Sequence, residues 1–297
     1  PAKPAPDYSA LRKMALQGDI TVNKLVAHGG TVSDISLHLN AKDGQLKLDP
    51  LKANLYEGTI GLVSALDVTT DTPAMAMQFD LDNVQAGPLL KDFIQKEIVE
   101  GTLKANFTLN TTGDSADNIK QTLNGNGNLF FRDGALIGID LAKLARTIKS
   151  GFIFDEQGEK PKTDFAELSV PFTIVNGLVN TSGSELKSPF LRVNTDGDVN
   201  LVSEELNLTV VPKIVGTMKG QGDEEERAGL AIPVQVAGTF QEPTFKPDLK
   251  ALAKEQNITE EERTEAIKTG EISEERKEKL KEDLGKAKGL LKGLFSN

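Results

Sequence analysis

The stretch "ISLHLNAKDGQLKLD", residues 35–49, decides the fold class of this chain. Apolar and polar side chains alternate along it, which places Ile35, Leu37 and Leu39 on one face of an extended segment. A period of two is typical of a strand that buries one face. The Asp43-Gly44 pair in its middle tolerates the positive φ of a two-residue hairpin turn. The stretch therefore predicts two neighbouring antiparallel strands.

The same pattern recurs from Gly18 to about Phe245. Further one-face-apolar strands are predicted by the alternating sets Met75, Met77, Phe79, Leu81; Leu103, Ala105, Phe107, Leu109; Leu168, Val170, Phe172, Ile174; and Leu230, Ile232, Val234, Val236. Turns between strands are predicted at Asn124-Gly125, Asp133-Gly134, Asn176-Gly177 and Asp196-Gly197, with weaker signals at Glu57-Gly58 and Glu100-Gly101. The sequence thus predicts a long antiparallel meander. Alternation does not separate a closed sandwich from an open groove, because both bury the same face.

Two helices are predicted to interrupt the strands and cover an end of the apolar face. Residues 87–98 carry apolar side chains at helical spacing, and residues 140–152 begin at Asp140, a good N-cap. A mobile lid is the alternative role for them. After residue 247 the strand pattern gives way to a charged helical tail whose last segment is basic and amphipathic. An anionic membrane, a protein partner and the chain's own domain are three open docking sites for that tail.

Composition restricts the classes of function. The 297 residues carry a net charge of -10, which argues against nucleic acid, because a phosphate backbone needs a basic surface. The chain has no cysteine, so disulfides and thiol catalysis are excluded. No apolar run is long enough to span a membrane. The Pro/Ala-rich start reads as a linker, and we expect the chain to be a fragment of a longer protein.

No catalytic, metal-binding or nucleotide-binding motif occurs in the sequence context that it requires. His28 and His38 lack metal-ligand spacing, so we interpret both as surface histidines. The "GNGNLF" stretch at Gly125 lacks the third glycine of a dinucleotide site and leads into a strand. The acidic residues 222–227 lack the alternating oxygen ligands of a calcium loop. We therefore expect no enzyme, no cofactor and no metal site.

Several pieces resemble the AsmA family in the same order as in that family. The first is "FRDGALIGIDLAKLAR", which resembles its strand-turn-helix signature. The other pieces are residues 31–68, 71–93, 186–216 and 232–249, and the likeness covers residues 16–252. The resemblance implies a periplasmic protein, tethered to the inner membrane in the full-length chain, that contributes to outer-membrane biogenesis. It also implies phospholipid movement along a curved β-sheet groove. The family's N-terminal membrane helix is not in this sequence.

Residue pattern and resemblance together predict a mainly β fold: an extended, curved antiparallel sheet, as a groove or partly open barrel, with two short covering helices and a helical C-terminal tail. The expected division is a linker over residues 1–16, a β-groove domain over 17–247 and the tail over 248–297. Expected partners are phospholipid or fatty acyl chains, envelope membranes and a protein partner for the tail. The alternative is a scaffold protein with a closed β core. The candidate lipid-facing residues are Leu37, Leu39, Met77, Phe79, Phe107 and Phe172.

Overall fold

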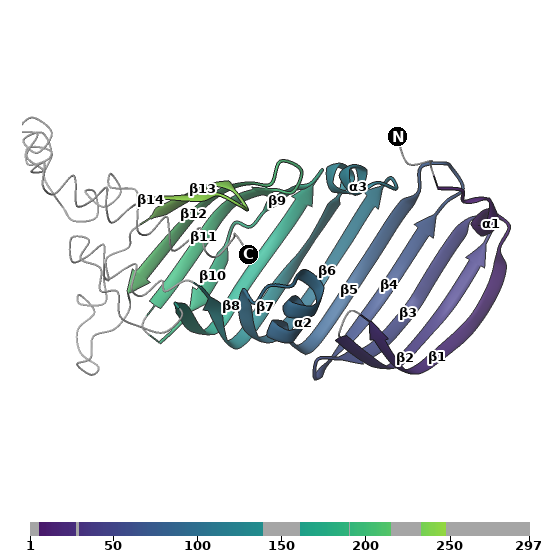
Figure 1. Cartoon of the computed structure of the whole chain (residues 1–297), viewed down its shortest axis with the longest axis horizontal. Coiled ribbons are helices and arrows are strands. Elements are labelled where there is room, and N and C mark those ends of the chain that lie inside the picture. Colours follow the sequence, from purple (N-terminus) through teal and green to yellow (C-terminus); the bar gives the residue numbers. More distant parts are fainter. Residues whose placement is uncertain (1–5, 28–29, 139–160, 190, 215–232, 248–297) are drawn as a thin grey trace, which may run out of the picture.

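A computed structural model describes residues 6–27, 30–138, 161–189, 191–214 and 233–247, which form one long antiparallel sheet with short helices (Figure 1). The strands are β1 (Ala15–Ala27), β2 (Gly30–Lys42), β3 (Gln45–Leu55), β4 (Gly58–Asp67), β5 (Ala74–Gln85), β6 (Val99–Thr112), β7 (Asn124–Ile137), β8 (Lys162–Val175), β9 (Leu178–Asn180), β10 (Ser184–Lys187), β11 (Leu191–Asn200), β12 (Glu205–Ile214), β13 (Val234–Thr239) and β14 (Pro243–Pro247). The helices are α1 (Ser9–Arg12), α2 (Ala86–Ile94) and α3 (Ala116–Thr122).

The strands follow one another across the sheet in chain order, so the predicted meander is confirmed. The one departure is that β9 and β10 share a single position between β8 and β11. In the described part of the chain the outermost strands, β1 and β14, do not pair with each other, so the sheet is open. The mainly β, extended and antiparallel fold class is therefore confirmed.

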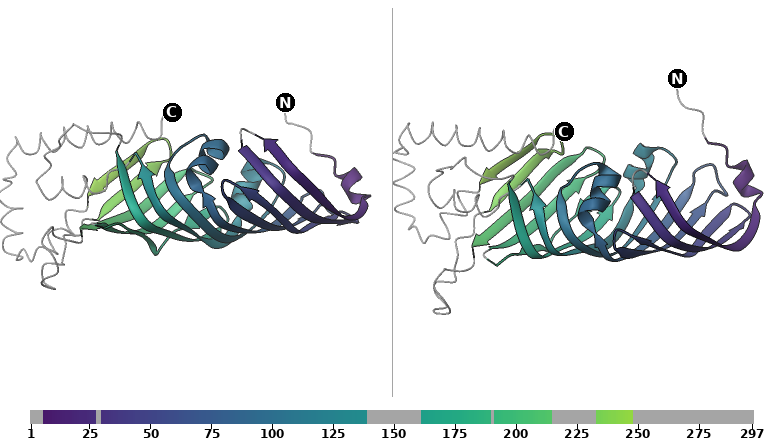
Figure 2. Two further views of the ribbon diagram at one scale, coloured as in Figure 1. Left: turned by 90° about the horizontal axis from the view of Figure 1, so that it is seen from below. Right: turned by 60° about the horizontal axis from the view of Figure 1, so that its bottom comes forward.

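The curvature of the sheet gives it a concave and a convex side. Figure 2 shows the strands bending up at both ends, with α2 inside the concavity. Leu89 and Leu90 of α2 pack against a core cluster that includes Val84, Leu103 and Phe131. Leu103 lies on the apolar face predicted for its strand, because alternate residues of a strand point to opposite faces. Since α2 packs on Leu103 from inside the concavity, the concave side is that apolar face.

The hairpin turns were predicted with mixed success. Asp43-Gly44 joins β2 to β3, the Glu57-Gly58 pair lies at the junction of β3 and β4, and Asn176-Gly177 joins β8 to β9, as predicted. The other four predicted turns are wrong. Asn124-Gly125 begins β7 after α3, so it does not join two strands. The chain continues as a strand through Asp133-Gly134 in β7, Asp196-Gly197 in β11 and Glu100-Gly101 in β6.

Three of these misplaced turns have a positive φ inside a strand, at Gly101, Asp133 and Gly197. The β6–β7 register shifts between Glu100 and Thr102, and Asp133 has a φ of 49°. A G1 β-bulge uses the same positive φ as a hairpin turn, so both favour glycine. These three dipeptides therefore have the positive φ that the sequence predicted but no chain reversal, and Asn124-Gly125 has no positive φ.

Of the predicted helices, the first is confirmed as α2, which ends at Ile94 because Gln95 adopts a left-handed conformation with φ 57°. The second, residues 140–152, and the C-terminal tail, residues 248–297, lie outside the described residues. Two further short helices were not predicted, α1 and α3. The backbone N–H of Asn118 donates to the Ser115 hydroxyl at 3.2 Å, which caps the N-terminus of α3.

Candidate functional site

The six candidate residues lie on the concave face in two neighbouring rows that cross the sheet. Strand pairing opposes Leu37 to Leu51 and Phe79 to Phe107, and the first row is continuous from β1 to β8. Its members are Ile20, Leu37, Leu51, Leu62, Phe79, Phe107, Gly127 and Phe172. The second row contains Leu39, Leu48, Ser64, Met77 and Leu109. The structure thus gathers all six candidates into one apolar surface.

Aromatic rings form the centre of the first row. The Phe79 and Phe107 rings stack with centroids 4.7 Å apart, and the Phe172 ring lies 6.2 Å from Phe107 in a tilted arrangement. Gly127 occupies the strand between Phe107 and Phe172. Because glycine has no side chain, the Phe172 ring reaches across it toward Phe107, which covers the gap that glycine leaves in the face. In the sequence, this contact between Phe107 and Phe172 is indicated by Gly127, which occupies a position of β7 where alternation would place an apolar side chain.

The concave face is covered unequally along its length. Beneath and beside α2 the side chains are buried, including Val84, Leu103 and Phe131. The six candidate side chains are only half-buried. The face therefore combines a sealed core with an apolar surface that the described part of the chain leaves partly open.

A hydrogen bond holds α2 over the sheet. The Tyr56 hydroxyl donates to Asp92 Oδ2 at 2.7 Å, and the backbone N–H of Gln85 donates to the Tyr56 carbonyl at 2.9 Å. Burial, followed by the bond to Asp92, raises the pKa of Tyr56 to about 12. The Tyr56 hydroxyl also occupies the space that a side chain at Gly30 would fill. Tyr56 thus links α2 to the end of the β1–β2 hairpin.

The last turn of α2 carries exposed apolar side chains. Ala86, Leu89 and Leu90 lie on the helix stripe that packs on the core, and Phe93 and Ile94 continue that stripe at helical spacing. Phe93 is nevertheless 72% exposed and Ile94 48% exposed. The helix therefore presents uncovered apolar area beside the partly open face.

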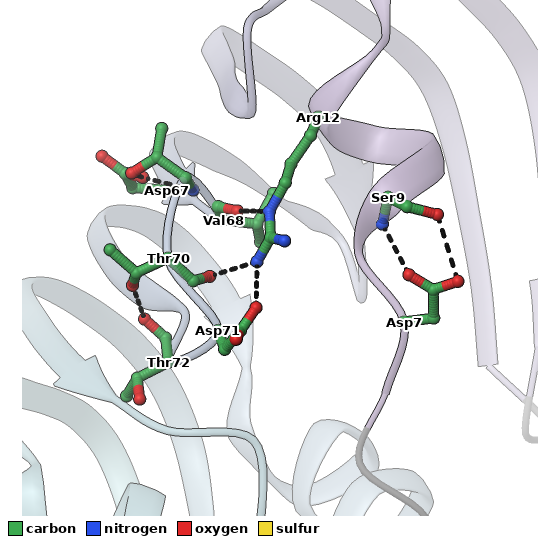
Figure 3. Close-up of polar contacts among 9 residues, drawn as sticks. Asp7, Ser9, Arg12, Asp67, Val68, Thr70, Asp71 and Thr72 are labelled. Carbon is green, nitrogen blue, oxygen red and sulfur yellow. Dashed lines mark hydrogen bonds and ion pairs between the residues drawn. The ribbon is translucent and has the colours of Figure 1, made fainter.

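One arginine, Arg12, holds α1 against the loop between β4 and β5 (Figure 3). Arg12 Nε donates to the Val68 carbonyl at 2.6 Å, and its terminal nitrogen donates to the Thr70 carbonyl and to Asp71, each at 2.7 Å. These acceptors belong to the loop between β4 and β5. Arg12 therefore folds the segment before β1 back over the strand ends.

A hollow of about 630 Å³ lies where β3 to β6 end near α3. Leu46, Leu66 and Met75 contribute apolar lining, and Thr111 and Asn110 contribute polar lining. The Thr111 hydroxyl donates to the Ile119 carbonyl at 3.0 Å, which fixes α3 against β6. Lys47 and Asp67 also line it, so the hollow combines hydrocarbon, neutral polar and charged groups.

Titratable side chains on the described residues do not form a metal-binding cluster. No group of three or more histidine, cysteine, aspartate or glutamate side chains in the described ranges is placed to hold a metal ion. His38 lies on the polar side of β2, where its Nδ1 is 2.7 Å from Asp19 Oδ1. His28 and residues 222–227 lie outside the described residues. Within those ranges no helix is long and apolar enough to cross a membrane.

An open, curved antiparallel sheet with a partly covered apolar concave side defines a β-groove protein. The profile of the AsmA family matches residues 3–183, which is more than half of the chain, so the chain belongs to the AsmA family. This confirms the resemblance seen in the sequence. The family is one of bacterial envelope proteins linked to outer-membrane assembly.

Two curated relatives, both from Escherichia coli (strain K12), match most of this chain. Protein AsmA is 20% identical over 244 residues, which is 81% of this chain and 40% of the relative. AsmA family protein YhjG is 24% identical over 229 residues, which is 73% of this chain and 31% of the relative. The chain thus spans less than half the length of either relative. No solved structure matches the chain significantly.

Proposed function

We propose that the concave face binds the acyl chains of phospholipids and conducts them along the sheet. In this proposal the protein is non-enzymatic and works in the periplasm, tethered to the inner membrane in its full-length form. Its contribution to outer-membrane biogenesis is to carry lipid between envelope membranes. Membership of a family linked to outer-membrane assembly supports this assignment.

One observation carries the proposal: the row of apolar side chains from Ile20 to Phe172 crosses the sheet without a charged residue. A hydrocarbon chain makes no directional bonds, so it needs only a continuous apolar surface that is shielded from water. The half-buried rings of Phe79, Phe107 and Phe172 provide such a surface. Met77 beside them adapts to irregular tails, because its side chain is flexible.

The expected free energy is sufficient for reversible binding. Burying hydrocarbon contributes about 0.8 kcal/mol per methylene, so full burial of about sixteen carbons contributes about 12 kcal/mol. An open face covers only one side of the chain, which reduces this to about 6 kcal/mol before the cost of association. Contacts without hydrogen bonds also predict little selectivity among tails and easy sliding along the row.

The experiment compares two charge insertions on β6. Phe107→Asp places a carboxylate in the apolar row, and Thr108→Asp places one on the polar face at the next, exposed residue. Native mass spectrometry of the purified chain should show co-purified phospholipid in the unsubstituted protein and in Thr108→Asp, and none in Phe107→Asp. Phe107→Leu keeps the site apolar and should retain lipid.

Two results would count against lipid binding. One is an unsubstituted chain that carries no lipid and takes up no fluorescent fatty acid. The other is equal lipid retention by Phe107→Asp and Thr108→Asp. Unfolding of Phe107→Asp alone would instead assign Phe107 to a protein core. The sealed cluster beneath α2 is the observation that favours the competing scaffold function, in which the sheet acts through protein partners.

A further inference from the structure

The two edges of the sheet differ in length and in proline content. The β14 edge is five residues long and has a proline at each end, Pro243 and Pro247. Proline lacks a backbone donor, and short edges with proline are a recognised protection against edge-to-edge pairing. The β1 edge is thirteen residues long, contains no proline, and pairs with β2 alone in the described part of the chain.

Exposed apolar side chains outnumber the two charged ones, Asp19 and Lys24, along β1. Exposed fractions are 51% for Leu16, 44% for Ile20, 37% for Val22, 51% for Leu25 and 62% for Val26. A long edge strand with exposed apolar side chains pairs readily with another strand. Ile20 and Leu16 belong to the concave apolar face, since they oppose Leu37 and Ala41 of β2. The apolar surface therefore runs to the edge and stops there uncovered.

The described residues before β1, 6–14, do not pair with this edge. Arg12 of α1 bonds to the loop between β4 and β5, which lies three strands inward from β1. The Arg12 side chain also lies against Gly44, in the β2–β3 turn. The described residues before β1, 6–14, are thus directed away from the outer side of β1.

We propose that β1 pairs antiparallel with β1 of a second copy of this chain, in a register centred on Ile20. In this register Ile20 opposes Ile20 of the second copy and Gly18 opposes Val22, all on the apolar face. On the polar face Asp19 opposes Thr21, and no two like charges are opposed between residues 15 and 25. A two-fold axis requires a surface that is complementary to itself, and this register satisfies that condition.

The pairing has a direct consequence for the concave face. A two-fold axis perpendicular to the sheet keeps both apolar faces on the same side. The rows that start at Ile20 would then continue into the second copy, and the sheet would double in width. The proposal does not depend on lipid binding, because the backbone pairing and the apolar contacts are the same with or without a ligand.

The test uses single cysteines, which are unique labels in a chain that has no cysteine. Ile20→Cys places two thiols directly opposite each other, where Cα atoms of antiparallel strands are about 5 Å apart, within disulfide range. Val22→Cys is the matched control on the same face, because its two copies would be four residues apart along the strands, about 13 Å. Mild oxidation should therefore give a covalent dimer with Ile20→Cys and none with Val22→Cys.

Sedimentation measures the same contact without a label. The unsubstituted chain should sediment as a dimer of the 32.0 kDa protein, and Ile20→Lys, which opposes two lysines, as a folded monomer. The proposal is overturned if the unsubstituted chain is monomeric at its highest soluble concentration. It is also overturned if Val22→Cys crosslinks as readily as Ile20→Cys, or if Ile20→Lys is folded and remains dimeric.

Discussion

Gly127 is the position where one added methyl group tests the architecture of the concave face. It lies between Phe107 and Phe172 in the central row. A Cβ atom at Gly127 would lie 2.6 Å from the Asn106 carbonyl oxygen and 2.7 Å from Phe107 Cα. Both neighbours are backbone atoms of β6, so a rotamer change cannot relieve the contact. We expect Gly127→Ala to displace β6 from β7.

We expect Gly127→Ala to lower the free energy of unfolding by about 1–3 kcal/mol, which is the usual effect of forcing extra carbon atoms into a well-packed site. Gly61→Ala is the control, since Gly61 also lies within a strand, β4, but the nearest atom to its added Cβ is Asp80 Cβ at 3.8 Å. That distance is ordinary van der Waals contact. Gly61→Ala should leave the free energy of unfolding unchanged within about 0.5 kcal/mol, as for surface substitutions away from special features.

Urea unfolding followed by circular dichroism measures the difference. With a slope of about 3 kcal/mol per molar urea, Gly127→Ala should lower the midpoint by roughly 0.3–1 M relative to Gly61→Ala. Equal midpoints for the two variants would refute the reasoning. They would mean that β6 and β7 are not held as closely as the Phe107–Gly127–Phe172 arrangement requires.

Two further substitutions test the contacts that fix the helices. Tyr56→Phe should lower the free energy of unfolding by about 0.5–1.5 kcal/mol, because Asp92 loses its donor. In the unsubstituted chain, stability should fall as pH rises from 10.0 to about 12, since the folded state holds the phenolic proton more tightly, and this fall should be smaller in Tyr56→Phe. An equal fall in the two proteins would assign it to other groups. Arg12→Ala should speed amide hydrogen exchange in residues 6–14 and 68–72. Arg12→Lys should speed it nearly as much, because lysine lacks the several donors of the guanidinium group. Unchanged exchange in both variants would show that Arg12 does not hold α1.

The sheet could be predicted from the sequence because its signal is local. Alternation along a strand fixes which residues share a face, so Leu37, Met77 and Phe107 were assigned to the apolar side from spacing alone. The chain-order meander followed from short connections such as Asp43-Gly44. Both inferences use residues that are close in the sequence.

The irregular positions could not be predicted in the same way. Gly197 was predicted to lie in a turn, but it lies within β11, where its carbonyl accepts from the backbone N–H of Thr181 at 2.9 Å. Thr181 is the point where β9 ends before β10 begins on the same side of β11. The residue types Asp-Gly therefore predict a positive φ from local sequence. Whether the chain reverses there or continues beside an interrupted neighbouring strand depends on pairing across the sheet, which local sequence does not give.

Local sequence also does not predict which residues of the concave face are covered by α2. The sequence placed Leu103 and Phe107 on the same face of one strand, yet Leu103 is buried in the core cluster and Phe107 is half-buried. The difference arises from where α2 lies, which Tyr56 and Asp92 determine across a separation of 36 residues. α1 was likewise missed, because Arg12 finds its acceptors more than fifty residues away.

A fatty acid with a photoreactive diazirine near the end of its tail tests the central claim most directly. After irradiation, peptide mass spectrometry identifies each residue that the tail has touched. The account predicts adducts on the concave rows, at Leu37, Leu39, Met77, Phe79, Phe107 and Phe172. Adducts on polar-face residues such as Gln78 and Thr108, or no adducts on the sheet, would contradict it.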